Sequence, residues 1–458
     1  MGNENRSTTP SSTAFQEFVG QQWADRTDAP AQLRESAQAA VNRRTALSLA
    51  YPGQRLVFAA GAEKTRSNDT SYPYRAHSDF AYLTGWGSSS EPDAVLVLEP
   101  TADGHEAVLY FRAPAGRDSD EFYANPAIGE FWIGPRPSLE YVATELGLTT
   151  RDLSELDASF GEAGNPTDLA QHLSEMRLVK DDYEIAQMRL AIEATARGFS
   201  DITRVLPMIA GNPRGERIIE GAFASRARLE GNDVGYGTIA AAGPHACILH
   251  WVKNDGTVNA GDLVLIDAGV ELDSLYTADI TRTLPVSGRF NPVQRKVYEA
   301  VLEAADAAFA IVKPGITFNE VHKAAMAVIA RKTAEWGLLP VSAEESLKPE
   351  NQHHRRYMVH GTSHHLGLDV HDCAAARREM YMDGVVTEGM IFTIEPGLYF
   401  QPDDLTVPVD LRGIGVRIED DILVTATGAE NLSRDIPRTV ADVEAWLSPA
   451  PRAARRKK

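Results

Sequence analysis

The chain has 458 residues, with 45 Lys and Arg against 64 Asp and Glu, so its formal net charge at pH 7 is −19. At about 150 residues per domain this length predicts two or three domains, and the hydrophobic fraction of 43 % excludes a wholly disordered chain. The acidic excess argues against binding to nucleic acid or to an anionic membrane, because phosphate groups would be repelled.

The amino terminus and the cysteines indicate a cytoplasmic protein. Residues 1–13 are polar, and we expect a disordered segment there. They also lack the basic and apolar regions of a secretory signal. No stretch approaches the ~18 consecutive apolar residues of a membrane span. Cys247 and Cys373 exclude a disulfide framework and a zinc site made of CxxC pairs, and their isolation fits a reducing compartment.

Residues 14–178 are predicted to form an α/β domain. Three short apolar runs of buried-strand length lie at 56–60, 94–98 and 107–111. The segment from Asp152 to Leu173 is typical of helix and loop, and a domain boundary follows near residues 177–182.

Residues 179–446 are predicted to form a second domain, of the α+β class. It begins with a helix capped by Asp181 or Asp182, whose apolar stripe is Ile185, Met188, Ile192, Thr195 and Phe199. Two more amphipathic helices are expected at 292–312 and 318–336, and strands at 263–268, 391–394, 414–418 and 422–425. The basic tail, residues 447–458, is expected to be a disordered, solvated end rather than a nucleic-acid-binding segment.

Four carboxylates of the second domain stand at strand positions where burial is costly. They are Asp267, Asp279, Glu395 and Glu419. Any one of them alone is better explained as a turn cap or as the partner of an arginine. Together they exceed what Arg282 and Arg417 can neutralise, and a buried carboxylate must be paired, protonated or bound to a metal. If the four converge, two divalent cations would cancel their charge, and oxygen-rich sites suit hard cations such as Mn²⁺.

Histidines form a second unusual pattern. His360, His364 and His371 fall within twelve residues, together with His365, and Gly361 and Gly367 in the same segment predict a glycine-hinged loop rather than a helix. A further histidine, His250, ends the short run 247–250. A single histidine is more often structural, but packing does not explain a glycine-spaced cluster.

Five segments carry a resemblance to a known family. They are Ile266–Gly269, Ala278–Thr283, His360–His364, Ile394–Gly397 and Arg417–Asp420. In this order and spacing, residues 176–445 resemble the metallopeptidases of the pita-bread fold, which include methionine aminopeptidase, prolidase and aminopeptidase P. The resemblance implies a pita-bread (creatinase/aminopeptidase) domain after a creatinase-like α/β domain.

Within that group the chain is most similar to aminopeptidase P, the Xaa-Pro aminopeptidase. The segments Gly367–Asp372 and Arg412–Asp421 resemble that family's sequence at nearly every position, and His77–Gly85 resembles its amino-terminal domain. Two positions depart from the pattern. Ala81 stands where relatives often carry an aromatic residue, and His365 directly follows the expected ligand His364.

The resemblance implies two divalent metal ions, most often Mn²⁺, and a role for each site residue. Asp267 would bind one ion, Asp279 and Glu419 would bridge both, and His364 with Glu395 would complete the second. A hydroxide between the ions would attack the scissile carbonyl, while Glu395 would pass a proton to the leaving proline nitrogen. His250, His360 and His371 would bind substrate or stabilise the tetrahedral intermediate. Arg417 would orient the ligands, with Tyr236 as a partner.

The implied function is hydrolysis of the first residue from peptides that have proline in second position. One alternative is a prolidase that cleaves only Xaa-Pro dipeptides, since it would share every metal ligand. A second is a binding protein that keeps the fold without the chemistry, which the presence of all the ligands disfavours. The implied partner is the peptide substrate, and relatives form homodimers or homotetramers.

Overall fold

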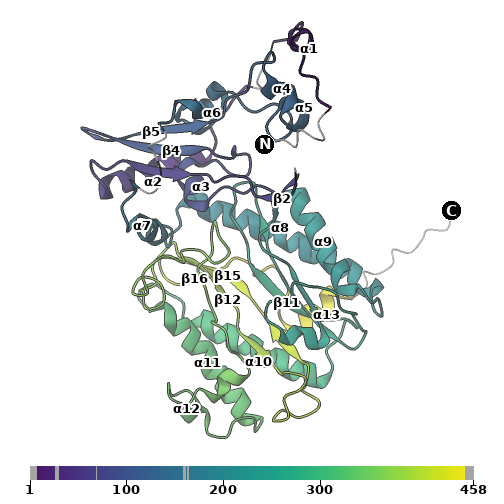
Figure 1. The fold of residues 1–458 in the computed structure, drawn as a ribbon. Helices are drawn as coiled ribbons and strands as arrows, with labels where there is room; N and C mark the ends of the chain where they lie inside the picture. The colour runs from purple at the N-terminus through teal and green to yellow at the C-terminus, as the bar shows by residue number, and fades with distance from the viewer. Residues whose placement is uncertain (1–7, 26–29, 69, 158–160, 162–163, 449–458) are drawn as a thin grey trace, which may run out of the picture. The chain divides into compact units, whose positions relative to one another are not determined.

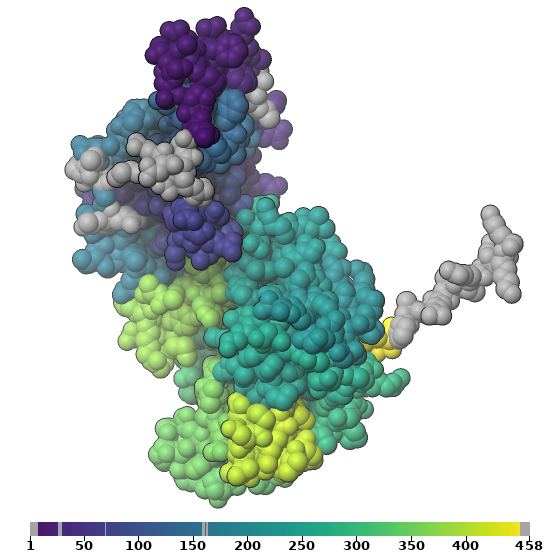
Figure 2. Space-filling model, turned by 45° about the vertical axis from the view of Figure 1, so that its right-hand side comes forward, coloured from purple at the N-terminus to yellow at the C-terminus, as the bar shows by residue number. Residues whose placement is uncertain are grey.

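The computed structural model describes residues 8–25, 30–68, 70–157, 161 and 164–448, and the other residues are drawn in grey in Figures 1 and 2. Most of the two ends predicted to be disordered, residues 1–7 and 449–458, lies outside the described residues. The chain divides into two compact units, Met1–Leu169 and Ala170–Lys458. Among the described residues, no helix is both long and apolar enough to cross a membrane.

The described part of the first unit contains a four-stranded sheet. Its strands are β1 (Leu56–Ala59), β4 (Val95–Thr101), β5 (Gly104–Phe111) and β6 (Thr149–Asp152), in the order β1-β4-β5-β6. The first three form at the predicted apolar runs and pair antiparallel. β6 pairs with β5 in parallel, which requires a crossover, and helix α6 (Leu139–Leu146) lies in that connection.

The first unit also contains a hairpin and several helices. They are β2 (Thr65–Ser67), β3 (Thr70–Ser71), α1 (Thr13–Val19), α2 (Ser36–Ala50), α3 (Ser78–Thr84), α4 (Asp120–Ala124) and α5 (Glu130–Ile133). Part of the family-like segment forms α3, which Gly85 ends with a φ of +71°, a left-handed conformation that glycine adopts without strain.

Two pairs of long helices belong to the second unit. α8 (Asp182–Val205) packs against α9 (Gly215–Glu230), and α10 (Pro292–Ala310) packs against α11 (Phe318–Glu335). The cap predicted for α8 is confirmed, because Asp181 accepts a hydrogen bond from the N–H of Glu184. Four residues of the predicted stripe are buried, and Ile185 is half-buried. The shorter helices are α7 (Leu169–Met176), α12 (Ala343–Ser346) and α13 (Val440–Trp446).

Small antiparallel sheets follow each helix pair in the chain (Figure 1). After α9 come β8 (Ile239–Ala242), β9 (Leu263–Ala268) and β11 (Ile280–Pro285), in the order β11-β9-β8. After α11 come β12 (Ile391–Ile394), β15 (Asp420–Val424) and β16 (Ala429–Asn431), in the order β12-β15-β16. Two ribbons pair β13 (Gly397–Tyr399) with β14 (Gly415–Arg417) and β7 (Asp233–Val234) with β10 (Val270–Glu271).

One hydrophobic core extends through both helix pairs and both sheets. It includes Phe199 of α8, Phe223 of α9, Tyr298 of α10, Ile266 of β9 and Phe392 of β12. Every residue of β9 and β11 is buried, so the carboxylate of Asp267 inside β9 has little access to bulk water. The fold therefore brings charge into the interior at the place where the sequence is most apolar.

The strand predicted at 414–418 is shorter than expected. β14 ends at Arg417, and Glu419 lies in the connection to β15. The chain changes partner here, because β14 pairs with β13 whereas β15 pairs with β12. The strand predicted at 414–418 therefore ends one residue early, and Glu419 stands outside it.

Candidate metal centre

All nine residues singled out as catalytic or metal-binding line one cavity of about 340 Å³ in the second unit. They are His250, Asp267, Asp279, His360, His364, His371, Glu395, Arg417 and Glu419. They come from the segment between β8 and β9, from β9 itself, the residue before β11, the loop 360–371, the residue after β12, and the end of β14 with the connection that follows it. Residues more than 150 positions apart in the chain thus meet because the two sheets face the same cavity.

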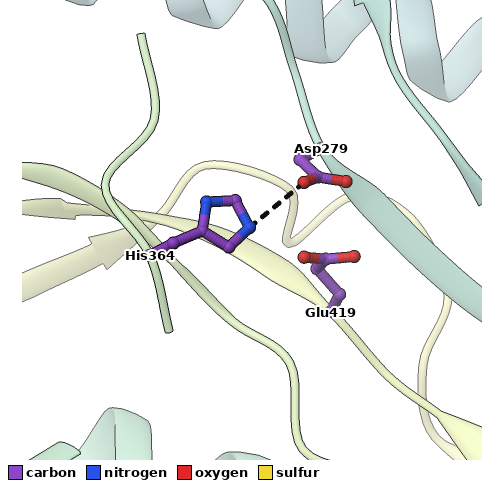
Figure 3. A group of neighbouring side chains, drawn as sticks. All are labelled: Asp279, His364 and Glu419. Atoms are coloured by element: carbon purple, nitrogen blue, oxygen red, sulfur yellow. Dashed lines mark ion pairs between the residues drawn. The ribbon is translucent and has the colours of Figure 1, made fainter. Parts of the chain in front are cut away.

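Asp279, His364 and Glu419 form the tightest group in this cavity. Each offers one ligand atom, and these atoms all lie within 4.8 Å of one another. Figure 3 shows the imidazole directed at the two carboxylates. Nε2 of His364 lies 3.3 Å from Oδ2 of Asp279. Two carboxylates and an imidazole at this spacing are a suitable ligand set for a divalent transition metal.

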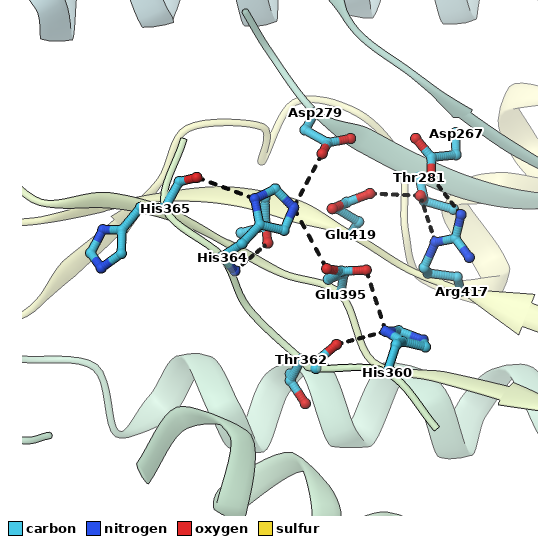
Figure 4. Close-up of polar contacts among 12 residues, drawn as sticks. Asp267, Asp279, Thr281, His360, Thr362, His364, His365, Glu395, Arg417 and Glu419 are labelled. Atoms are coloured by element: carbon cyan, nitrogen blue, oxygen red, sulfur yellow. Dashed lines mark hydrogen bonds and ion pairs between the residues drawn. The ribbon is translucent and has the colours of Figure 1, made fainter. Parts of the chain in front are cut away.

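His364 is oriented by its own loop. Its Nδ1 donates to the carbonyl oxygen of His365 at 3.2 Å, which leaves Nε2 as the nitrogen that faces the carboxylates (Figure 4). Backbone hydrogen bonding of the second ring nitrogen is typical of metal-binding histidines. The ring of His365 instead stacks on Phe318, with centroids 4.6 Å apart. The structure thus places His364, and not His365, at the carboxylate cluster.

Glu395 lies on the other side of the same imidazole. Its Oε1 is 3.6 Å from Nε2 of His364, and its Oε2 is 3.6 Å from Nδ1 of His360. The backbone N–H of Glu395 donates to the carbonyl oxygen of Thr362 at 2.8 Å, so β12 and the histidine loop hold each other in place. Glu395 therefore contacts both a ligand-type histidine and a histidine of the cavity wall.

Asp267 is held by two donors. Arg417 donates to its Oδ2 at 2.5 Å, and the hydroxyl of Tyr236 donates to its Oδ1 at 2.7 Å. Tyr236 also lies in hydrogen-bond contact with Asp279. Thr281, opposite Asp267 in the β9–β11 register, donates to Glu419 at 2.6 Å and accepts from Nε of Arg417 at 3.1 Å. These contacts fix the direction of each carboxylate.

Burial and crowding change the proton affinity of the cluster. Burial and the neighbouring Asp267 raise the pKa of Asp279. Burial raises the pKa of Glu395 to about 7, and burial with the charge of Asp279 raises the pKa of Glu419 well above its ordinary value. Burial opposes a charged imidazole, but the hydrogen bond to Asp279 and the charge of Glu395 raise the pKa of His364 to about 9.

These shifts show that the protein groups fit a divalent cation. Four carboxylates face one cavity, and among its lining residues Arg417 alone carries a permanent positive charge. The raised pKa values of Asp279, Glu395, Glu419 and His364 favour the protonated forms, which limits the repulsion. A divalent cation would supply the missing positive charge and displace those protons.

Tyr399 is a site residue that the sequence reasoning missed. Its hydroxyl accepts from Arg417 at 3.1 Å and lies 2.8 Å from Nε2 of His360. It reaches this position because Gly397 has no side chain: a Cβ there would lie 2.4 Å from the Tyr399 hydroxyl oxygen. The glycine two residues before the tyrosine, outside any predicted strand, was the available signal.

The two other histidines differ in their surroundings. The ring of His371 meets that of His364 edge-on, with centroids 4.4 Å apart, and burial with the nearby His364 lowers the pKa of His371. His250 is exposed and lines both this cavity and a second one of about 370 Å³. The second cavity shares Asp267, Asp279 and His371 with the first and adds Tyr236 and Val252. The cluster thus opens into two adjoining spaces.

Sequence comparison gives matches along nearly the whole chain. Residues 186–426 match metallopeptidase family M24, and residues 40–170 match the aminopeptidase P amino-terminal domain. The chain is 49 % identical to Xaa-Pro aminopeptidase 1 of Streptomyces coelicolor over 442 residues, which cover 91 % of this chain and 88 % of that protein. It is 34 % identical to Xaa-Pro aminopeptidase of Escherichia coli, with 86 % and 94 % covered.

Solved structures show the same relationship. The fold resembles a glutamate-to-alanine variant of Escherichia coli aminopeptidase P in complex with substrate, with a TM-score of 0.77 and 32 % identity. That match covers 90 % of this chain and 98 % of the other. Pseudomonas aeruginosa aminopeptidase PepP matches with a TM-score of 0.78 and 32 % identity, covering 91 % and 99 %. The expected pita-bread fold with its amino-terminal domain is thus confirmed.

Proposed function

The chain belongs to metallopeptidase family M24, and from this premise we propose that it is an Xaa-Pro aminopeptidase, a metal-dependent hydrolase that removes the first residue of peptides with proline in second position. The observation that carries the proposal is the convergence of four carboxylates, three of them buried, and His364 in a cavity lined by three more histidines. Relatives with this activity in their names match the chain over most of its length.

The proposed metal ligands are Asp267, Asp279, His364, Glu395 and Glu419, which would hold two divalent cations. Asp279 and Glu419 are proposed as the bridging pair, because their carboxylates both lie within ligand distance of His364. When bound, the cations polarise the scissile carbonyl and activate a water molecule. We propose Mn²⁺, since carboxylate oxygens with a single imidazole suit a hard divalent metal.

Glu395 is proposed to move the proton of the reaction. Burial raises the pKa of its carboxyl to about 7, so the group gains and loses a proton near neutral pH. It would accept a proton from the attacking water and donate it to the leaving proline nitrogen. Any amide nitrogen needs a proton to leave as an amine, and that of an Xaa-Pro bond, a tertiary amide, has no N–H by which an enzyme could hold it.

The cavity histidines are proposed to bind the substrate. Burial lowers the pKa of His360 to about 3, so its imidazole is neutral at physiological pH. A neutral imidazole has one N–H, and that of His360 is on Nδ1, which donates to the carbonyl oxygen of Gly361 at 2.6 Å. To donate to a substrate carbonyl or oxyanion, His360 would have to exchange this partner. His250 and His371 line the same cavity and are proposed to share this role. Arg417 is proposed to orient Asp267 and Tyr399, to which it donates.

Several broader expectations stay proposals. We propose domain limits of 14–178 for the amino-terminal domain and 179–446 for the catalytic domain. We also propose a homodimer or homotetramer that binds no nucleic acid, because the net charge is −19. A cytoplasmic location is proposed from the two buried, unpaired cysteines.

One assay tests the function directly. The protein, stripped of metal with a chelator and reloaded with Mn²⁺, should release the first residue from an Xaa-Pro-Yaa peptide. The chelated protein and an Xaa-Ala-Yaa peptide are the controls, and neither should give comparable release. Equal cleavage of the alanine peptide would contradict the proposed specificity.

Peptide length separates the two hydrolase alternatives. An Xaa-Pro dipeptide and an Xaa-Pro-Yaa-Zaa peptide are compared at equal concentration with the same Mn²⁺-loaded protein. An Xaa-Pro aminopeptidase should cleave the longer peptide. Turnover of the dipeptide alone would show a prolidase.

A further inference from the structure

The segment that carries His250 has no regular structure to hold it. Residues 248–257 form neither helix nor strand between β8 and β9. His250 nevertheless lines both cavities, and Val252 lines the second. A catalytic side chain must keep its position to within a fraction of an ångström, so this segment requires another anchor.

The carboxylate of Glu216 supplies that anchor. Glu216 lies in the first turn of α9, and its side chain is fully buried. Its two oxygens accept four hydrogen bonds, which occupy both lone pairs of each oxygen. The donors are Ala242 N–H (2.8 Å) and His245 Nδ1 (2.8 Å) to Oε1, and Trp251 Nε1 (2.9 Å) and Gly256 N–H (2.6 Å) to Oε2.

These four donors lie on both sides of His250 in the chain. Ala242 and His245 precede it, Trp251 follows it directly, and Gly256 ends the irregular stretch. The rings of His245 and Trp251 also stack, with centroids 3.9 Å apart. The indole is thus fixed at its edge by Glu216 and on its face by His245, and this fixes the backbone that leads into His250.

The close approach of Gly256 shows that the segment is wrapped around the carboxylate. A Cβ at residue 256 would lie 2.7 Å from the carboxyl carbon and from both oxygens of Glu216. The backbone N–H of Glu216 also donates to the carbonyl oxygen of Gly256 at 3.4 Å. Only glycine at position 256 lets the backbone approach the Glu216 carboxylate this closely. The segment therefore folds around this carboxylate.

A second polar anchor lies further from the cavity. Asn254 is buried, accepts from the N–H of Ala240 at 3.0 Å and donates to the carbonyl oxygen of Thr238 at 2.8 Å. It fixes the far end of the segment to β8. Only Glu216 contacts the residue next to His250, so the two anchors are not equivalent.

We propose that Glu216 is the positioning residue of His250, holding the 242–256 segment so that this imidazole faces the substrate. The inference rests on the proposed function, because His250 has its role only there. Replacement by glutamine leaves one carbonyl oxygen for four donors and turns an NH₂ group toward N–H groups. The segment should then loosen without loss of the metal ligands.

A double-mutant cycle tests this in the full-length, Mn²⁺-loaded protein. The variants are Glu216→Gln, His250→Ala and the double variant, assayed for kcat and KM on an Xaa-Pro-Yaa peptide. We expect Glu216→Gln to lower kcat by about tenfold with unchanged metal content, and to cost less than about twofold in the His250→Ala background. The proposal would be overturned if the fold-reduction of kcat in the double variant equalled the product of the two single-variant reductions. An unchanged kcat in Glu216→Gln would also overturn it.

Glu184→Gln is the matched control. Glu184 is also a buried carboxylate in the first turn of a long helix, and it accepts from the hydroxyl of Tyr276 at 3.0 Å. Any effect of its substitution on kcat should multiply with that of His250→Ala, because it makes none of the four contacts to the 242–256 segment. Trp251→Phe provides a milder variant that removes one donor and keeps the stacked ring. It should show the same coupling to His250 if Glu216→Gln does not fold.

Hydrogen exchange separates this proposal from the proposed function. Amide exchange at residues 250–256 should be faster in Glu216→Gln than in the wild type, and unchanged in Glu184→Gln. Unchanged exchange there would overturn the anchoring role. An absence of Xaa-Pro cleavage by the wild-type protein would instead overturn the proposed function. The hydrogen-exchange result would then still show whether Glu216 anchors the 242–256 segment.

Discussion

Nε2 of His364 lies 3.3 Å from Oδ2 of Asp279, although the two residues are 85 positions apart in the chain. This contact joins the histidine loop to the strand β11 and places an imidazole next to a carboxylate whose pKa is raised by burial. The spacing suits the proposal that the two residues are ligands of one cation, and the first prediction tests that proposal.

Asp279→Asn should lose metal and most activity. The amide is neutral, so it removes one charge from the cluster and weakens the shared ligand of the proposed pair. We expect at least one of the two metal ions to be lost on dialysis, measured by elemental analysis, and kcat on an Xaa-Pro-Yaa peptide to fall by about a hundredfold or more.

Asp403→Asn is the control for that substitution, because Asp403 is exposed and does not line the cavity. It removes the same charge from the protein and should change neither metal content nor kcat. Wild-type metal content in Asp279→Asn would contradict the assignment of Asp279 as a shared ligand.

Metal binding should release protons and strengthen as the pH rises. In the metal-free site the pKa of Glu395 is raised to about 7 and that of His364 to about 9, so at pH 7 His364 carries a proton and Glu395 is about half protonated. A cation binds the deprotonated forms and must displace these protons. Calorimetry of Mn²⁺ binding at pH 7 in buffers of different ionisation enthalpy should therefore report release of more than about one proton.

The same titration gives the direction of the affinity change. Between pH 6 and pH 8 the dissociation constant for Mn²⁺ should fall by about tenfold per pH unit for each proton displaced. His364→Gln removes one of these protons and should reduce the slope. An affinity independent of pH in this range would contradict the raised proton affinities.

The proposed carboxylate ligands could be predicted because each stands in or beside an apolar run of the sequence, which is a local pattern. Asp267 interrupts an apolar run, and Asp279, Glu395 and Glu419 adjoin others, where a charge is conspicuous without knowledge of the fold. The resemblance then supplied the pairing among them. The strand carrying Arg417 was predicted too long, because the sequence does not show that the chain changes partner from β13 to β12.

Tyr399 and Glu216 could not be identified in this way. The role of Tyr399 depends on the register of β13 with β14, which places Gly397 opposite Arg417 and so brings Tyr399 to the arginine. Glu216 stands in an amphipathic helix, where acidic residues are normally solvated. Its burial depends on the 242–256 segment folding around it, and such long-range contacts have no local signature.

Tyr399→Phe should lower kcat without releasing metal. The hydroxyl links Arg417 to His360, and the phenylalanine keeps the ring while removing both contacts. Loss of a hydrogen bond to a charged group costs about 1.5–3 kcal/mol, so we expect kcat to fall by roughly ten- to a hundredfold. Steady-state kinetics and elemental analysis measure the two quantities.

Tyr357→Phe is the matched control for the tyrosine substitution. Tyr357 is a buried tyrosine of the same unit that donates to the carbonyl oxygen of Leu338 at 3.0 Å and does not line the cavity. This variant should lose stability and keep kcat. A wild-type kcat in Tyr399→Phe would show that the link from Arg417 to His360 has no part in turnover.

The stability of the metal-free protein should fall as the pH rises from about 6.5 to about 9. The folded-state pKa of Glu395 is raised from 4.5 to about 7, so this group binds more protons in the folded protein than in the unfolded chain between these values. Below about pH 6.5 the buried histidines with lowered pKa, such as His360, contribute in the opposite direction. The pKa of His364 is raised from 6.5 to about 9, so its stabilising contribution is complete below pH 6.5 and is lost as the pH rises through 9.

The two shifts each correspond to a change on the order of 3 kcal/mol in the free energy of unfolding. Mn²⁺ replaces the protons, so the difference in Tm between loaded and metal-free protein should widen from pH 5.5 to pH 8.5. Groups outside the cluster titrate in both forms and cancel in this difference. In His364→Gln the metal-free Tm should decline less between pH 7 and pH 9. A Tm difference that narrows with pH would mean that the carboxylates of this cavity do not repel one another in the metal-free protein.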